Sequence, residues 1–169
     1  MSNGFPDGEF CIVNEDTGLY LASLPGDRVT GSQQETDWLE GAKETVHYSH
    51  TGKQVLGLAT EPSGKNYERW YFDDRKNSRG LEFYHLVNCA KDIRTAYALA
   101  AELNIHGRYD EVTVKGHGQQ GQTQWRAEDG YFFPGDPTKA VTLREEQPGR
   151  YRVVVADRGG EPRQKWRFV

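Results

Sequence analysis

Cysteine is scarce in this chain, with two among 169 residues. Cys11 and Cys89 allow at most one disulfide, whereas secreted domains held together by disulfides carry more cysteines in a shorter chain. We therefore interpret both as free thiols. A chain of this length forms a core large enough to fold without a disulfide or a structural metal.

Long hydrophobic runs are also missing. The longest uninterrupted apolar run covers residues 96–101, far short of the roughly 18 residues that a transmembrane helix needs, so the sequence predicts no membrane span. Five acidic residues precede the first basic residue, Arg28, so the basic start that is typical of a signal or transit peptide is missing. This pattern favours a cytoplasmic location, and a mature fragment of a longer precursor fits it too.

A basic excess is absent, because Asp and Glu outnumber Lys and Arg by 25 to 21 and the formal net charge is -4. Proteins that bind nucleic acid carry a surplus of basic residues to neutralise phosphates. The composition therefore predicts no nucleic-acid partner.

Catalytic motifs are likewise missing. No Gly-x-Ser-x-Gly occurs, and Gly116-His117-Gly118 lacks the Lys-Ser/Thr of a phosphate-binding loop, so we interpret it as a flexible turn. The acidic pairs Asp73-Asp74 and Glu145-Glu146 lie beside basic residues, which is typical of solvated turns. We expect no catalytic residues, no cofactor and no enzymatic activity.

What the sequence does contain is a repeat marked by Trp70, Trp125 and Trp166, each of which follows a turn rich in Gly and polar residues. Each unit begins with a strand-like opening segment that starts at a Gly. A second strand-like run follows, and then a β-type run that precedes the tryptophan. The β-type runs are residues 55–59, 112–115 and 153–156, the second strands are 19–22, 95–99 and 140–143, and the openings are 8–14, 80–88 and 130–133.

Three units of about four short strands each, without a convincing amphipathic helix, predict an all-β fold with internal threefold symmetry, which is a β-trefoil. We expect one domain over residues 1–169, with units at 8–79, 80–129 and 130–169. Residues 96–103 favour a helix by propensity, but the repeat predicts a strand there. The three repeated tryptophans are expected to pack in the shared core rather than to bind sugar.

Three motifs carry a resemblance to a known family. The opening Phe10-Cys11-Ile12-Val13-Asn14, the turn Asp16-Thr17-Gly18 and the closing Gln164-x-Trp166 resemble the ricin-type β-trefoil lectins, over essentially the whole chain. Only the third unit has the literal Gln-x-Trp. The resemblance implies a lectin-like module with carbohydrate as the first candidate ligand.

The resemblance also implies where sugar would bind: an Asp after the second strand of a unit and an aromatic residue on its third strand. Neither requirement is met in any unit. The Asp positions hold Ala22, Ala100 and Arg144, and the aromatic positions hold Leu58, Thr113 and Val154. The usual galactose-type pocket is therefore not expected, and the amides of Asn66 and Gln164 are expected to cap their own backbone turns.

The first unit departs from its repeat through an insertion at residues 24–53, much longer than the matching loops of the other units. Long loops in compact domains are usually functional or disordered. Residues 45–49 alternate like a strand and are expected to form a hairpin with Gln54-Val55 through Thr51-Gly52. Two interpretations of the insertion's Trp38 remain open: it packs the loop onto the body, or it contacts a ligand.

If a residue-specific ligand site exists, we expect it in this insertion. Trp38 would stack on the ligand, and His47, Tyr48 and His50 would form hydrogen bonds to it. Asp37 and Glu40 would make the patch acidic and would favour a hydroxylated or cationic partner. The spacing His47-x-x-His50 does not match a metalloprotease pair, so no metal is expected. The alternative to carbohydrate is a protein partner. The chain would then bind that partner through its loops, as a protease inhibitor or as an interaction scaffold.

Overall fold

The computed structural model describes residues 3–25, 45–47, 54–60, 66–76, 79–80, 83–92, 95–103, 105–117 and 123–169. These residues are almost entirely strands and turns, with a single short 3-10 turn, η2 (Asn66–Glu68), as their helical element. The all-β prediction is confirmed. None of the helices among the described residues has the length and apolar character needed to cross a membrane.

The strands of the described residues form three antiparallel sheets. In chain order they are β1 (Glu9–Phe10), β2 (Ile12–Asn14), β3 (Tyr20–Pro25), β4 (Thr45–His47), β5 (Gln54–Ala59), β6 (Trp70–Asp73), β7 (His85–Asp92), β8 (Thr95–Leu103), β9 (Tyr109–Gly116), β10 (Arg126–Glu128), β11 (Tyr131–Phe133), β12 (Lys139–Gln147), β13 (Arg150–Asp157) and β14 (Trp166–Phe168). A seven-stranded sheet has the order β1-β6-β7-β8-β9-β13-β12, a five-stranded sheet has the order β14-β2-β3-β5-β4, and β10 pairs with β11.

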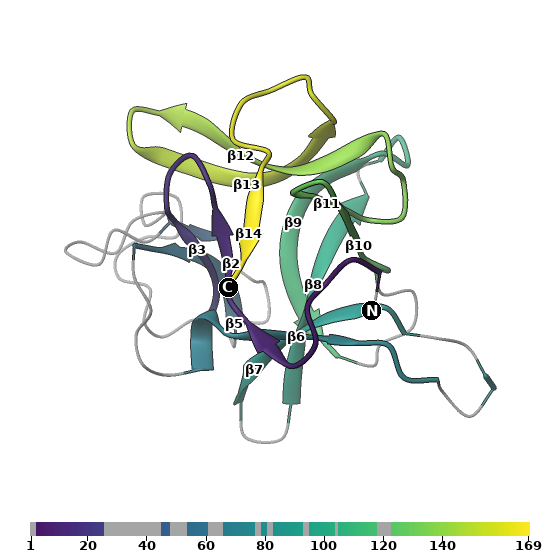
Figure 1. Ribbon diagram of the computed structural model, residues 1–169. Helices are drawn as coiled ribbons and strands as arrows, with labels where there is room; N and C mark the ends of the chain where they lie inside the picture. The colour runs from purple at the N-terminus through teal and green to yellow at the C-terminus, as the bar shows by residue number, and fades with distance from the viewer. Residues whose placement is uncertain are drawn as a thin grey trace.

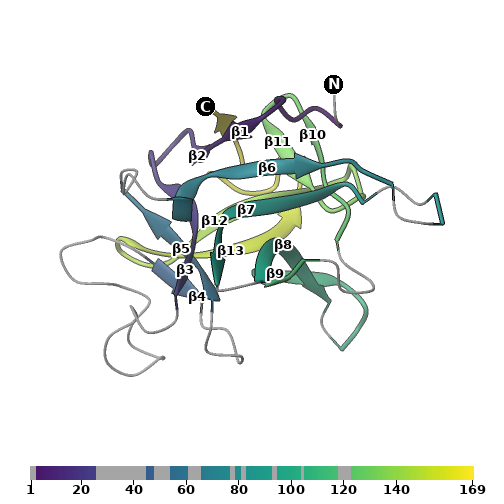
Figure 2. The same ribbon diagram turned by 90° about the horizontal axis from the view of Figure 1, so that it is seen from below.

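Three long antiparallel pairs, β3–β5, β8–β9 and β12–β13, dominate the structure. Figure 1 shows them on three sides of the paired strands β2 and β14. In Figure 2 the two chain ends and the short strands β1, β10 and β11 lie at one end of the molecule, and β4, β8 and β9 lie at the opposite end. The second and third strands predicted for each unit therefore all exist and pair with each other.

Residues 96–103, which favour a helix by propensity, belong to the strand β8, as the repeat predicts. This strand pairs with β7 on one side and β9 on the other. Tyr97, Ala98, Leu99 and Ala100 are all buried. Backbone pairing on both edges together with this burial outweighs a propensity difference of less than about 1 kcal/mol per residue.

The three repeated tryptophans lie in the core and are essentially inaccessible to solvent. Each indole Nε1 donates a hydrogen bond of 2.9 Å to a backbone carbonyl of the second strand of its segment. The pairs are Trp70 to Leu21 on β3, Trp125 to Leu99 on β8, and Trp166 to Val141 on β12. Core packing of these residues is confirmed, and the same indole contact occurs three times.

Two buried asparagines repeat a second contact. Asn14 ends β2, and Asn88 lies at the matching place in β7. The side-chain amide of each donates to the carbonyl of the residue three positions before a core tryptophan, Arg163 for Asn14 and Tyr67 for Asn88, at 3.1 and 2.9 Å. Each side-chain oxygen accepts the backbone N–H of the residue two positions further on, Asp16 or Ala90. These amides join segments that are distant in sequence.

The predicted hairpin of the insertion is confirmed in its backbone. Strand β4 pairs antiparallel with β5 in the register Thr45 with Leu58 and His47 with Leu56. It forms the edge of the five-stranded sheet. The turn expected at Thr51-Gly52 lies outside the described residues.

Cys11 and Cys89 are both free, as predicted. Burial raises the pKa of both thiols, and that of Cys89 reaches about 11. A thiol with so high a pKa stays protonated at neutral pH and is a weak nucleophile. We assign no reactive role to either cysteine.

Candidate functional site

The ligand patch expected in the insertion falls mostly outside the described part of the chain. Trp38, Asp37, Glu40, Tyr48 and His50 all lie there, and His47 is described only through its backbone in β4. The patch therefore stays a prediction.

Most of the positions at which the family resemblance implies sugar contacts are buried and cannot reach a ligand. Ala22, Ala100, Leu58 and Val154 are all buried in the core. Small and aliphatic side chains at these places pack the sheets and offer no polar or aromatic group to a sugar. These four positions therefore offer no contact to a sugar, while Thr113 is half-buried and Arg144 is exposed.

A hollow of about 560 Å³ lies where the turn after β2 meets the start of β11 and the turn before β14. Its size falls in the ordinary range of small-molecule sites. Its walls combine carboxylates, cations and one aromatic ring, contributed by Glu15, Asp16, Tyr131, Gly159, Glu161, Pro162, Arg163, Gln164 and Lys165.

The turns around this hollow are fixed by hydrogen bonds. The Asn14 side-chain oxygen accepts the backbone N–H of Asp16 at 3.1 Å, and the backbone N–H of Glu15 donates to the Lys165 carbonyl at 2.9 Å. Gln164 donates to the Thr142 hydroxyl and accepts from the backbone of the preceding turn. The amide of Gln164 thus serves the fold, as expected, and is not free to hold a ligand.

Tyr131 provides the aromatic surface of the hollow. The ammonium of Lys165 lies 4.2 Å from the centre of its ring, and the guanidinium carbon of Arg158 lies 4.9 Å from it. Glu161, which also lines the hollow, forms an ion pair with Arg144. Glu15 and Asp16 are both exposed to solvent. The hollow therefore offers hydrogen-bond acceptors, an ammonium donor and a ring within one surface.

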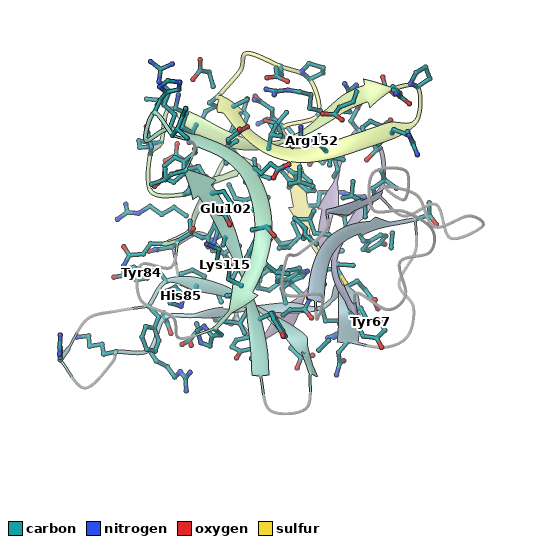
Figure 3. The ribbon with its side chains drawn as sticks, turned by 180° about the vertical axis from the view of Figure 1, so that it is seen from behind. Tyr67, Tyr84, His85, Glu102, Lys115 and Arg152 are labelled. Carbon is teal, nitrogen blue, oxygen red and sulfur yellow. The ribbon has the colours of Figure 1, made fainter. Side chains whose placement is uncertain are left out.

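A second cluster of polar side chains surrounds the carboxylate of Asp73, at the end of β6. Asp73 accepts hydrogen bonds of 2.9 Å from Nε and Nη2 of Arg75 and lies 2.9 Å from Nε2 of His117. Nδ1 of His117 lies 3.3 Å from Nδ1 of His85, which begins β7. Phe83 stacks on the His85 ring at a centroid distance of 5.2 Å. In Figure 3, His85 lies at the side of the molecule below the β8–β9 hairpin.

The interpretation of Asp73-Asp74 as a solvated turn is wrong for Asp73, which is buried. Likewise His117, assigned to a flexible turn, has a side chain only 12% exposed and in contact with Asp73. The pairing of β6 with β7 places Asp73 directly opposite His85, and β9 ends just before His117. These three residues meet only through the strand register, which no local motif encodes.

Two pKa values in this cluster are strongly shifted. Burial alone would raise the pKa of Asp73, but hydrogen bonds from Arg75 and His117 outweigh it and lower the pKa to about 2. Burial, reinforced by the neighbouring His117, lowers the pKa of His85 to about 4. At neutral pH the cluster thus holds an ionised carboxylate and an uncharged His85 ring.

These shifts predict a two-step loss of stability in acid. Between pH 6.5 and about 4 the unfolded chain protonates His85 while the folded chain does not, so the free energy of unfolding falls by about 3 kcal/mol. Between pH 3.8 and about 2 the same holds for Asp73, and stability falls further. Urea denaturation at a series of pH values measures both steps.

The variant His85→Asn is expected to flatten the first step and to leave the second in place. An unchanged slope between pH 6.5 and 4 in that variant would assign the first step to another group.

No group of three or more His, Cys, Asp or Glu side chains in the described ranges is arranged to hold a metal ion. No protein-family model matches the chain, and no curated protein matches it.

Proposed function

We propose that this protein is a non-catalytic binding module with a β-trefoil fold of lectin-like type, and that its ligand is a carbohydrate. The threefold recurrence of the indole-to-carbonyl contact supports the trefoil arrangement, because a threefold repeat places equivalent side chains in equivalent surroundings. The recurrent contacts of Asn14 and Asn88 support it in two of the three segments.

The hollow beside Tyr131 is the observation that carries the carbohydrate proposal. A sugar presents hydroxyl groups that both donate and accept, and an apolar face that stacks on aromatic rings. Glu15 and Asp16 would accept hydroxyl protons, and the Tyr131 ring would receive the apolar face. Lys165, which now lies over that ring, would move aside and donate to a sugar oxygen.

The charges of the hollow favour a neutral polyol over a phosphate. Three carboxylates, from Glu15, Asp16 and Glu161, face two cations, from Arg163 and Lys165. Arg144, which pairs with Glu161, balances the third carboxylate. A set of charges without a net sign suits a neutral ligand whose hydroxyl groups can use both signs.

The decisive experiment is a glycan array with the purified chain at high concentration, covering galactose-, mannose- and xylose-based ligands. We expect at least one bound class. Using the best binder, Tyr131→Ala is expected to lower affinity at least tenfold, because among the described residues it removes the one aromatic ring that lines the hollow. Tyr71→Ala, at a half-buried tyrosine of β6 that does not line the hollow, is the matched control and should bind normally.

The insertion is tested separately by Trp38→Ala. If the patch around Trp38 binds the ligand, affinity falls by about 2 kcal/mol, the range of interface hot spots, with little change in melting temperature. If the variant instead unfolds the protein while its folded fraction binds normally, Trp38 only packs the loop. If Trp38→Ala lowers the ligand affinity and Tyr131→Ala does not, the ligand binds at the insertion and not in the hollow.

A protein partner is the second candidate, and the exposed apolar side chains at the β8–β9 connection favour it. Ile105 is 96% exposed and Leu103 is 58% exposed. Hydrophobic side chains on a hairpin tip suit insertion into a partner's pocket. A blank glycan array, together with recovery of one stoichiometric protein in a pull-down that Ile105→Ser abolishes, would favour this alternative.

A further inference from the structure

We propose that His85 and His117 bind one divalent transition-metal ion through their two Nδ1 atoms, with Asp73 positioning His117 from its other ring nitrogen. This inference is independent of the carbohydrate proposal. It rests on the separation and orientation of the two imidazoles and on the carboxylate that contacts one of them.

The distance between the two Nδ1 atoms suits a shared metal. They lie 3.3 Å apart. Two nitrogen ligands that each sit about 2.0–2.1 Å from a tetrahedral ion are separated by roughly that distance, because the angle between them at the ion is near the tetrahedral value. The ring planes cross at 85°, so the two imidazoles are not stacked on each other.

Asp73 gives His117 the tautomer that a metal ligand needs. A carboxylate 2.9 Å from Nε2 holds the proton on that nitrogen, which leaves the lone pair on Nδ1. Carboxylate, histidine and metal in this order are a common arrangement, in which the carboxylate fixes the ring and raises its basicity. Arg75 in turn fixes the carboxylate through two parallel hydrogen bonds.

His85 begins β7, where its side chain is buried opposite Asp73. With the His117 lone pair on Nδ1, the 3.3 Å contact between the two Nδ1 atoms needs a proton on Nδ1 of His85 when no metal is bound. Metal binding requires the other tautomer of His85, in which the proton is on Nε2 and the Nδ1 lone pair is free for the metal. The number of protons on His85 is unchanged. Stacking on Phe83 limits rotation of the His85 ring.

The chemistry of the ligands selects among metals. Imidazole nitrogens suit Zn²⁺, Cu²⁺ and Ni²⁺, whereas Mg²⁺ and Ca²⁺ prefer oxygen ligands. Two protein ligands leave the remaining coordination positions to water or to a further ligand. We therefore expect Cu²⁺ to bind more tightly than Zn²⁺, and Mg²⁺ not to compete.

The test is a calorimetric titration of the purified, chelator-treated full chain with ZnCl₂ and CuCl₂. We expect one ion per chain and at least a tenfold loss of affinity in both His85→Asn and His117→Asn. Asp73→Asn is expected to weaken binding 10- to 100-fold while keeping both ligands, which is the effect of removing an outer-shell carboxylate. His106→Asn, at an exposed histidine of the β8–β9 turn, should bind as the wild type does.

Three results would overturn the proposal. The first is that no metal binds at a 100-fold excess of metal over protein. The second is that His85→Asn and His117→Asn both still bind the metal, and the third is that the double variant His47→Asn/His50→Asn loses binding instead. A measurement on the unaltered protein covers the case in which a variant fails to fold. Addition of Zn²⁺ should shift the ¹⁵N resonances of the Nδ1 atoms of His85 and His117 and leave that of His106 in place. Unshifted resonances for His85 and His117 at saturating Zn²⁺ would equally reject the site.

Discussion

Replacing Trp70, Trp125 or Trp166 by Ala is expected to lower the free energy of unfolding by about 3–5 kcal/mol in each case. All three side chains are buried almost completely, so truncation leaves a large cavity in the core. It also removes the donor for a buried carbonyl, of Leu21, Leu99 or Val141 respectively. Because the three contacts are alike in partner and length, we expect three similar losses.

Urea denaturation followed by circular dichroism measures these losses, and Trp→Phe variants separate their two causes. Phe keeps one of the two indole rings and lacks the Nε1 donor, so each Phe variant should leave a smaller cavity than Ala and should still lose about 1–3 kcal/mol for the unpaired buried carbonyl. One tryptophan whose loss costs less than about 1 kcal/mol would show that its segment is not equivalent to the other two.

Gly4→Ala is expected to destabilise the protein by about 3 kcal/mol, through backbone strain and overpacking together. Gly4 has a φ of +91°, and a Cβ at this position would overlap the backbone carbonyl oxygen of Ala127. The neighbouring Asn3 carbonyl accepts the Ala127 N–H at 2.8 Å. Phe5, the next residue, packs among the rings of the core. The small residue thus lets the N-terminal segment lie against β10.

Gly8→Ala is the matched control for this variant. Gly8 also has a positive φ, of +75°, but a Cβ there meets no atom within 4 Å. Its cost should be limited to backbone strain, about 1–2 kcal/mol. Equal melting temperatures for the two variants would mean that the Ala127 backbone moves aside at little cost. Differential scanning calorimetry of both variants makes the comparison.

Much of the fold was predictable because strands leave a local signal. β-type runs before each tryptophan correspond to β5, β9 and β13, and the second predicted strands correspond to β3, β8 and β12. The repeat predicted β8 correctly against its helical propensity, since equivalent segments of a repeat share their conformation. The interpretation of Gln164 as a capping amide is also confirmed, because its amide oxygen accepts the Gly159 N–H and its amide nitrogen donates to the Asp157 carbonyl, both a few residues earlier in the chain.

The sites were not predictable in the same way. Asp73, His85 and His117 come from β6, β7 and the end of β9, and the hollow joins the turn after β2 to residues near the C-terminus. An isolated Asp-Asp or Gly-His-Gly carries no information about what faces it.

The sequence by itself determined the all-β class, the places of the repeated strands and the burial of the three tryptophans, because periodicity and composition are properties of neighbouring residues. Only the tertiary structure decided that a buried carboxylate orients one histidine toward another, and that the chain ends help to form a polar hollow. The physical reason is register. A shift of one residue between paired strands turns every side chain to the opposite face, and the packing of the whole domain fixes that register.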